Sequence, residues 1–264
     1  MSLSTHKLNV SYAQQQVIHS LDLKLPAAKV SVLIGSNGCG KSTLLRAMAR
    51  LLKPQSGAVI LDGMDIHASS TAQVARRLAI LPQIPVAPEG ISVRQLVSLG
   101  RFPYQSWLRQ WSAEDERQVD EALRLTGTDA LQHRAVDALS GGQRQRVWIA
   151  MTLAQATDTL LLDEPTTYLD LAHQVEVLEL LRDLNQTHGK TIVMVLHDLN
   201  LACRYADHLV AVHDGRVYAQ GAPAGIMTEA LVNKVFNLQC RIIEDPFFRS
   251  PLCIPFPGAL HADA

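Results

Sequence analysis

The sequence predicts an α/β fold with a mostly parallel central sheet, and three observations lead to that prediction. Short apolar segments of strand length alternate with segments of helical periodicity over most of the 264 residues. Several strand segments are apolar at nearly every position, which is typical of strands buried on both faces of a sheet. The first segment, "LNVSY…QQVIHSLDLKLP", alternates between apolar and polar residues instead. We therefore expect antiparallel strands at the N-terminus, flanking the main sheet.

The expected elements follow one another in a regular order. "VSVLI" at 30–34 is the first buried strand, and a glycine-rich loop and the helical segment "KSTLLRAMARLL" come after it. "AVILD" and "LAIL" are further strands, and "TLLLD" at 159–163 is an apolar run that ends in an acid. "TIVMVLHD" is another buried strand. After Gly221 we expect one or two small helices and then a proline-rich end.

A long amphipathic helix is predicted between "TLLLD" and "TIVMVLHD". Five apolar residues recur there at helical spacing, namely Leu171, Val175, Leu178, Leu181 and Leu184. The helix should run to about Thr187, because "HGK" then interrupts the pattern.

Residues 84–140 differ in character from the rest of the chain. They carry no buried-strand segment, and "SAEDERQVDEALRLTG" indicates a helix with Ser112 as its N-cap. We therefore predict a single domain spanning 1–264, with an inserted α-helical subdomain at approximately 84–140.

Composition excludes several classes of protein. The formal net charge is −1, from 24 Lys and Arg against 25 Asp and Glu, which argues against a protein that coats nucleic acid. No apolar run approaches the roughly 18 residues that a membrane span needs. The N-terminus lacks the apolar core of a signal peptide, so we expect the chain in the cytoplasm. The four cysteines have no paired spacing, which indicates free thiols rather than a metal site.

The first glycine-rich loop has the pattern of a phosphate-binding loop. Gly35, Gly40, Lys41 and Ser42 fit G-x-x-x-x-G-K-[ST] between a strand and a helix. Backbone N–H groups of such a loop surround phosphate oxygens, and the helix N-terminus adds the positive end of its dipole. Lys41 would reach the β- and γ-phosphates, and the Ser42 hydroxyl would bind Mg²⁺. The alternative is a turn that resembles this loop by chance. Cys39 is either a small filler in the loop or a redox-sensitive thiol.

Two adjacent acids close the apolar run "TLLLD". Asp163 ends it and Glu164 follows. Asp163 is predicted to supply the carboxylate that Mg²⁺ needs from a neighbouring strand. Beyond a strand end both side chains can point into one crevice. Glu164 would then orient or deprotonate an attacking water, and a solvated surface glutamate is the alternative.

A second glycine-rich loop, "LSGGQRQR", lies at 139–146. Ser140, Gly141 and Gly142 can donate hydroxyl and amide hydrogens to a γ-phosphate at the N-terminus of the helix "GQRQRVWIAMTLAQ". For these residues alone, a helix cap is the alternative interpretation.

Four motifs together resemble those of ATP-binding-cassette (ABC) ATPases. "GSNGCGKST", "LSGGQRQR", "TLLLDEPTTYLD" and "VLHDLN" occur in the order and spacing of that family, over nearly the whole chain. The resemblance implies ATP and Mg²⁺ as cofactors and a dimer of two copies that sandwich two ATP molecules. Each ATP then lies between the first loop of one subunit and the "LSGGQ" signature of the other. Loss of the γ-phosphate removes those contacts and loosens the dimer.

The resemblance also assigns roles to single residues. The catalytic residues that it implies are Glu164, His197, Gln83 and Lys41, and the metal ligands are Ser42, Gln83 and Asp163. The nucleotide-binding residues that it implies are Tyr12, Gly35, Ser36, Asn37, Gly38, Cys39, Gly40, Lys41, Ser42, Thr43, Ser140, Gly141, Gly142, Gln143 and Asp170.

For four of these residues the implied role is more specific. Tyr12 would stack on adenine, with a core tyrosine as the alternative. His197 would contact the γ-phosphate, with a packed histidine or the principal base as alternatives. Gln83 would contact Mg²⁺ and the attacking water. Asp170 would communicate across the dimer, beside Tyr168 where many relatives carry a small residue.

Longer segments are similar to bacterial ferric-siderophore import ATPases. They are "GRFPYQSWLRQWSAEDERQVDEAL", "TTYLDLAHQVEVLELL", "VLHDLNLACRYADHLVAVHDGRVYAQGAP" and "RIIEDP". This resemblance implies an ATPase at the cytoplasmic face of the membrane, working with separate permease subunits and, indirectly, a periplasmic or surface binding protein. The permease would dock on Arg101, Phe102, Tyr104 and Trp107. Packing of Trp107 with Trp111 inside the subdomain is the alternative.

Three other functions remain open. A haem or vitamin B12 importer would use the same machinery. A cassette protein acting on ribosomes or DNA usually has tandem cassettes or a long coiled-coil insertion, and this chain has neither pattern. A kinase would share the first loop but would give no reason for "LSGGQRQR".

Overall fold

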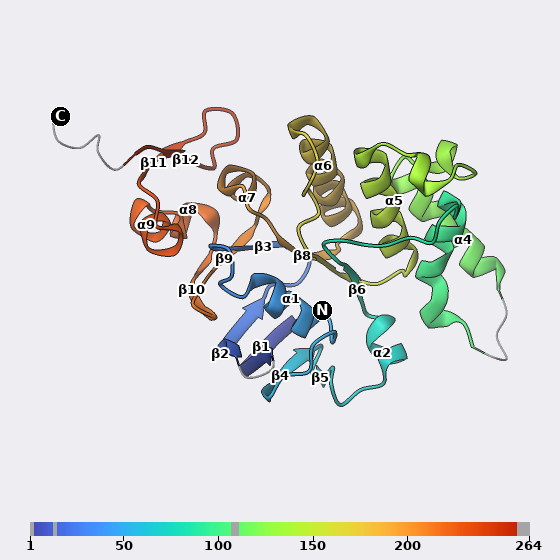
Figure 1. The fold of residues 1–264 in the computed structure, drawn as a ribbon, viewed down its shortest axis with the longest axis horizontal. Coiled ribbons are helices and arrows are strands. Elements are labelled where there is room, and N and C mark those ends of the chain that lie inside the picture. Colours follow the sequence, from blue (N-terminus) through green and yellow to red (C-terminus); the bar gives the residue numbers. More distant parts are fainter. Residues whose placement is uncertain (1–2, 13–14, 107–110, 258–264) are drawn as a thin grey trace. The chain divides into compact units, whose positions relative to one another are not determined.

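The computed structural model describes residues 3–12, 15–106 and 111–257, and the chain divides into two compact units (Figure 1). The first unit comprises Met1–His67 and Val193–Ala264, and the second comprises Ala68–Ile192. No helix in the described parts of the chain combines the length and the apolar character needed to cross a membrane.

The first unit contains an antiparallel sheet built from the N-terminal segment. Its order is β2-β1-β4-β5, with β1 antiparallel to β2 and β4, and β4 antiparallel to β5. Along β2 buried residues alternate with exposed ones from Ser20 to Leu25, as the sequence pattern predicts. The strands are β1 (Leu3–Tyr12), β2 (Gln15–Leu25), β4 (Ser56–Leu61) and β5 (Met64–Asp65).

The first unit also holds part of the larger sheet, in the order β10-β9-β3-β8. β3 pairs with β9 in parallel, and β10 adds an antiparallel edge. Every residue of β3 and β8 is buried, as expected for uniformly apolar strands. The strands are β3 (Val30–Ile34), β8 (Thr191–Val195, which enters this unit at Val193), β9 (His208–His213) and β10 (Arg216–Gly221).

Helix α1 (Lys41–Met48) lies between the two sheets of the first unit (Figure 1). Leu44, Leu45 and Met48 are therefore fully buried, and Lys41 is buried at its start. The helix is shorter than the predicted segment to 52. Its chain leaves the helical conformation at Arg50, whose φ is +63°, a left-handed value that is uncommon for a non-glycine residue and ends a right-handed helix.

The C-terminal part of the first unit has more structure than a proline-rich end suggests. After α7 (Leu199–Tyr205) come α8 (Pro223–Ile226) and α9 (Glu229–Phe236), which confirm the small helices. The hairpin of β11 (Cys240–Glu244) and β12 (Pro251–Pro255) was not predicted. The prolines at both ends of β12 argued against a strand in the sequence, because proline is disfavoured in strands except at sheet edges. Burial raises the pKa of Cys203 and of Cys253 to about 12.

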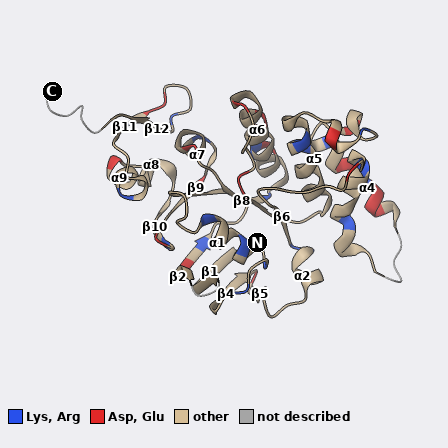
Figure 2. Cartoon of the chain, viewed as in Figure 1, with Lys and Arg blue, Asp and Glu red and all other residues tan. Residues whose placement is uncertain are grey.

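The second unit combines a parallel strand pair with helices. β6 (Leu78–Leu81) and β7 (Thr159–Leu162) pair in parallel, and α5 packs against β6 and against α3 and α4. Ser112 caps α4 as predicted, and Figure 2 shows acidic and basic residues interspersed on that helix. The helices are α2 (Thr71–Ala75), α3 (Val93–Ser98), α4 (Ala113–Leu125), α5 (Gly141–Ala154), α6 (Leu171–His188) and the short 3-10 helices at Leu99–Tyr104, Asp129–Leu131 and Val136–Ala138.

The end of α6 agrees with the sequence prediction. The helix stops at His188 and is capped by Gly189, whose φ of +62° lies in the left-handed region. The segment 84–140 is helical in its described elements, but the compact unit is larger, Ala68–Ile192. The organisation as one domain with an insertion at 84–140 stays a prediction.

Candidate functional site

The first glycine-rich loop joins β3 to α1 inside the first unit. Gly35 has a φ of +154° and Gly40, the N-cap of α1, a φ of +107°. A Cβ on Gly35 would overlap the carbonyl oxygen of Val212 and lie 2.7 Å from Cys39 Sγ. A Cβ on Gly40 would lie 2.8 Å from Ile18 Cδ1. Gly35 therefore requires glycine for conformation and for space, whereas Gly40 requires it mainly for its backbone conformation.

Lys41 folds back over its own loop. Its Nζ donates hydrogen bonds to the carbonyl oxygens of Gly35 (2.8 Å) and Ser36 (2.9 Å), and only 5% of the residue is exposed. Its Nζ also lies 3.9 Å from Cys39 Sγ. Burial raises the pKa of Cys39 in spite of Lys41, so this thiol is protonated at neutral pH. A protonated, buried thiol is a poor nucleophile, which favours the interpretation of Cys39 as a small filler.

The remainder of the loop presents polar groups at its surface. Asn37 and Gly38 are exposed, whereas Thr43 is buried at the start of α1. Ser36 and Ser42 are half-buried. A strand, a glycine turn and a helix N-terminus therefore follow one another in this unit, which is the arrangement that the phosphate-binding prediction requires.

Two further predicted residues lie in the first unit. Tyr12 ends β1 and is 43% exposed, so it is not a core tyrosine. His197 follows β8 and is also exposed, which argues against a packed histidine. The next residue, Asp198, accepts hydrogen bonds from the N–H groups of Asn200 and Leu201 and so caps α7. Both roles toward a nucleotide stay predictions.

The acid pair lies at the end of β7 in the second unit. Asp163 is buried (1% exposed), and Glu164 is half-buried with a φ of +54°. Glu164 Oε2 accepts a hydrogen bond from Gln83 Nε2 (2.6 Å) and one from Thr167 Oγ1 (2.9 Å). Gln83 and Glu164 are 81 positions apart in the sequence, but in the structure they form one hydrogen-bonded group. The structure also excludes the alternative of a freely solvated surface glutamate.

The second glycine-rich loop begins α5. Ser140 is the N-cap: its Oγ accepts a hydrogen bond from Gln143 N–H (3.3 Å), and Gln143 Oε1 accepts one from Ser140 N–H (3.2 Å). This is a capping box, so the cap interpretation of the loop is confirmed. Ser140 and Gly141 are exposed, whereas Gly142 is buried. The exposed edge of this helix N-terminus is free of acidic residues in its first turn.

Asp170 caps the next helix. Its Oδ1 accepts hydrogen bonds from the backbone N–H (2.9 Å) and from Nδ1 (2.7 Å) of His173. These two bonds, the backbone one first, lower the pKa of Asp170, so the carboxylate is ionised at neutral pH. The neighbouring Tyr168 is exposed and has a φ of +65°.

Arg101 is buried, and its prediction as a docking residue is wrong. Its Nε donates to Asp115 Oδ1 (2.9 Å), its Nη1 donates to the carbonyl oxygen of Ala154 (2.7 Å), and the guanidinium lies over the Tyr104 ring. Arg101 and Asp115 are only 2% and 1% exposed. An arginine next to aromatic residues in the sequence suggested an interface, but this one anchors the end of α5 instead. Trp107 lies outside the described residues.

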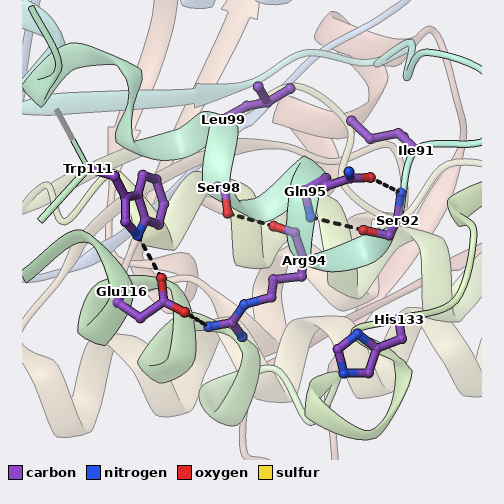
Figure 3. Close-up of a pocket in the computed structure, with 9 residues that line it drawn as sticks. All are labelled: Ile91, Ser92, Arg94, Gln95, Ser98, Leu99, Trp111, Glu116 and His133. Atoms are coloured by element: carbon purple, nitrogen blue, oxygen red, sulfur yellow. Dashed lines mark hydrogen bonds and ion pairs between the residues drawn. The ribbon is translucent and has the colours of Figure 1, made fainter. Parts of the chain in front are cut away.

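A groove of about 630 Å³ opens beside α3 in the second unit (Figure 3). Ile91, Leu99 and Trp111 give it an apolar lining, and Leu99 is half exposed. Arg94 crosses it, paired with Glu116 and with Asp120 (2.7 Å). The Arg94 hydrogen bond and then that of Trp111 Nε1 lower the pKa of Glu116. Trp111 thus lines a groove and remains partly exposed, rather than packing fully into the interior.

The predicted residues divide between the units. Tyr12, the loop 35–43 and His197 belong to the first unit, and Gln83, the loop 140–143, Asp163, Glu164 and Asp170 belong to the second. Sequence reasoning missed Thr167 and His173. The signal for His173 was its place three residues after a helix N-cap, where side chains meet.

Comparison with known proteins identifies the family. The family model described as "ABC transporter" matches residues 18–167. The chain is 71% identical over 255 residues to the achromobactin transport ATP-binding protein CbrD of Dickeya dadantii, covering 97% of this chain and 95% of that protein. It is 58% identical to the petrobactin import ATP-binding protein FpuD of Bacillus anthracis, over 96% and 93% of the two chains.

A solved structure agrees with these matches. A chain of a metal-chelate type ABC transporter in an inward-facing conformation superimposes with a TM-score of 0.84 at 27% identity, over 97% of each chain. The predicted α/β fold with an N-terminal antiparallel sheet and a mostly parallel core sheet is thereby confirmed. With the loop geometries above, these matches show that the chain belongs to the ABC transporter family and is one of its ATP-hydrolysing subunits.

Proposed function

We propose that this chain powers the import of ferric siderophores through a separate membrane permease, at the cytoplasmic face of the membrane. The high identity to proteins named for achromobactin and petrobactin supports this cargo class. The main structural support for ATP hydrolysis is the Glu164 carboxylate, which accepts hydrogen bonds from Gln83 and Thr167. Glu164 follows a buried strand and has a left-handed backbone conformation. Strained backbone of this kind concentrates at functional sites.

The first loop would bind the phosphates of ATP. The backbone N–H groups of residues 35–40 would surround the phosphate oxygens, and Lys41 would exchange its two carbonyl contacts for phosphate oxygens. Tyr12, exposed at the end of β1, would stack on the adenine ring.

Ser42, Gln83 and Asp163 are the residues that would hold Mg²⁺. All three offer hard oxygen donors, a hydroxyl, an amide carbonyl and a carboxylate, which is the ligand set that Mg²⁺ prefers. The metal would neutralise charge on the phosphates.

Glu164 would act on the attacking water. A carboxylate oriented by two hydrogen-bond donors is a fixed acceptor for the water proton, and Gln83 would report on the occupancy of the site through its amide. His197, exposed after β8, would contact the γ-phosphate.

The second glycine-rich loop at 139–146, called the signature loop from here on, would serve the nucleotide of a second copy. Its exposed Ser140 and Gly141 lie at a helix N-terminus, which attracts an anion from outside the chain. A cassette named MJ0796 has been solved as a dimer bound to ADP and Pi, and this chain resembles it with a TM-score of 0.72 at 27% identity over 83% of this chain and 98% of that one.

The groove beside α3 would receive a short helix of the permease. Its apolar lining with the charged Arg94 suits an amphipathic helix. Phe102, which is exposed in the same unit, would be a further docking residue. A periplasmic or surface binding protein would act only indirectly, through the permease.

Uptake of labelled ferric siderophores by cells that carry Glu164→Gln tests the proposal, with vitamin B12 and haem in parallel. We expect ATP binding to remain and hydrolysis to fall by about 10²–10⁴-fold, the range of a lost general base. Siderophore uptake should be lost as well. Glu89→Gln, in an exposed loop, is the matched control. Loss of vitamin B12 or haem uptake alone would overturn the cargo, and normal hydrolysis would overturn the role of Glu164.

A further inference from the structure

His173 links two loops of the second unit. Its Nδ1 donates to Asp170 Oδ1 at 2.7 Å, since an ionised carboxylate can only accept. The other edge of the same ring packs against Gly142 of the signature loop. A Cβ on Gly142 would lie 2.9 Å from His173 Cγ and 3.0 Å from Nε2, and closer still to Cδ2. One imidazole thus contacts the capping acid of α6 and the second glycine of α5.

This contact leaves no room for a side chain at residue 142 while the imidazole keeps its place. Gly142 lies within α5 and does not have a positive φ, so its backbone conformation is open to any residue. A glycine inside a helix costs about 1 kcal/mol relative to alanine. Space is one reason for the glycine, because the imidazole occupies the place that a side chain would take.

The imidazole is itself held on its opposite edge. Asp170 binds both the backbone N–H and the ring of His173, so the ring is fixed relative to the start of α6. Arg146, one turn further along α5, pairs with Glu176 of α6 at 2.6 Å. His173 and the Arg146–Glu176 pair therefore both link the N-terminal half of α5 to α6, and His173 lies directly against Gly142.

We propose that His173 is a positioning residue for the signature loop, which sets Gly142 and the neighbouring donors against the γ-phosphate bound by a second copy of the chain. The inference rests on the proposed function. His173 would not touch the nucleotide, and its effect would reach the other chain's ATP through Gly142.

Two substitutions separate the halves of the contact. His173→Ala removes the ring and its donor, whereas His173→Asn keeps an N–H donor for Asp170 but leaves the space over Gly142 empty. We expect both variants to hydrolyse ATP about 10-fold more slowly in the assembled transporter, with kcat lowered. ATP affinity of the isolated subunit should stay within about twofold of wild type, since the first loop is untouched. His188→Ala, at the exposed end of the same helix, is the control. Full activity of His173→Asn would mean that His173 serves only as the hydrogen-bond partner of Asp170, and it would overturn the proposal.

Mixed assemblies show on which site His173 acts. An assembly of one His173→Ala chain with one Lys41→Ala chain has one nucleotide site that combines an intact first loop with an intact signature loop. We expect its hydrolysis to rise at least about threefold above either variant alone. If His173 acted on its own chain's nucleotide, no site would be intact and no rise would occur.

A parallel mixture of Ser140→Arg with Lys41→Ala chains distinguishes the role of His173 from the nucleotide site that two chains share. Recovery there without recovery for His173→Ala would refute the role of His173 and leave the shared site standing. Failure of both mixtures would refute the shared site itself.

Discussion

The two glycine-rich loops both begin helices, but they are held in place by different means. The first loop is enclosed: Gly35 and Gly40 have positive φ values, and Lys41 is buried and bonded to the loop carbonyls. The signature loop is an ordinary helix start, with a Ser140–Gln143 capping box and exposed residues at 140 and 141. The geometry of the first is built into its own backbone, whereas the second depends on neighbours, His173 at its side and Arg101 at the far end of α5.

This difference suits the two proposed tasks. A loop that binds the nucleotide of its own chain gains from a rigid, preformed cradle. A loop that meets the nucleotide of another chain has to be exposed, so it cannot be stabilised by burial, and its rigidity comes from the helices behind it.

The largest effect is expected from a substitution that removes the contacts of Arg101 with the end of α5. Arg101→Ala leaves the Asp115 carboxylate buried without its cation and removes the hydrogen bond to Ala154. Loss of one partner of a buried ion pair costs about 3–5 kcal/mol. Urea unfolding of the whole chain should therefore show a fall of about 4 kcal/mol, with Arg117→Ala on the surface of α4 unchanged. A fall below about 1 kcal/mol would mean that the pair behaves like a surface ion pair.

The same ion pair predicts a dependence of stability on pH. Burial raises the pKa of Asp115, but the hydrogen bonds from Ser112 and Arg101 outweigh it and hold the pKa below its ordinary value. The ionised form is therefore favoured by folding, so its stabilisation is present at neutral pH and is lost as the pH falls below about 4. In Arg101→Ala this loss between pH 5 and 3 should shrink, which unfolding measured across that range would detect.

A smaller effect tests the built-in geometry of the first loop. Gly35→Ala requires a strained φ and places Cβ against the Val212 carbonyl, so we expect a loss of about 3 kcal/mol and no ATP binding. Gly38→Ala is the matched control, because Gly38 has a φ of +79° but open space around it; about 1 kcal/mol should be lost. Denaturant unfolding and nucleotide titration measure both. Equal losses for the two variants would show that the surroundings of Gly35 are not rigid.

The smallest effect sharpens the contrast at the signature loop. Ser140→Ala removes an N-cap, which costs about 1 kcal/mol, and leaves ATP binding by the isolated subunit unchanged. Ser70→Ala removes the same type of Ser–Gln capping box from α2. We expect similar unfolding losses from the two substitutions but slower hydrolysis only from Ser140→Ala. If Ser70→Ala slowed hydrolysis equally, the effect would come from stability and not from a phosphate contact.

The sequence by itself determined the fold class, the positions of the buried strands and the glycine pattern of the first loop. β3 and β6 have the predicted bounds, and Ser112 is the predicted cap, because uniform apolar runs and capping residues act through their immediate neighbours. The glycine pattern of the first loop was equally local.

Only the tertiary structure decided which side chains meet. It joined Gln83 to Glu164, buried Arg101 against Asp115, placed His173 over Gly142 and paired β11 with β12 through a proline-flanked strand. These contacts depend on where separate helices and strands pack, and a polar residue in a sequence carries no mark of the neighbour that will face it. Arg101 illustrates the physical reason: the same guanidinium suits a docking surface or a buried ion pair, and only burial at the end of α5 distinguishes the two.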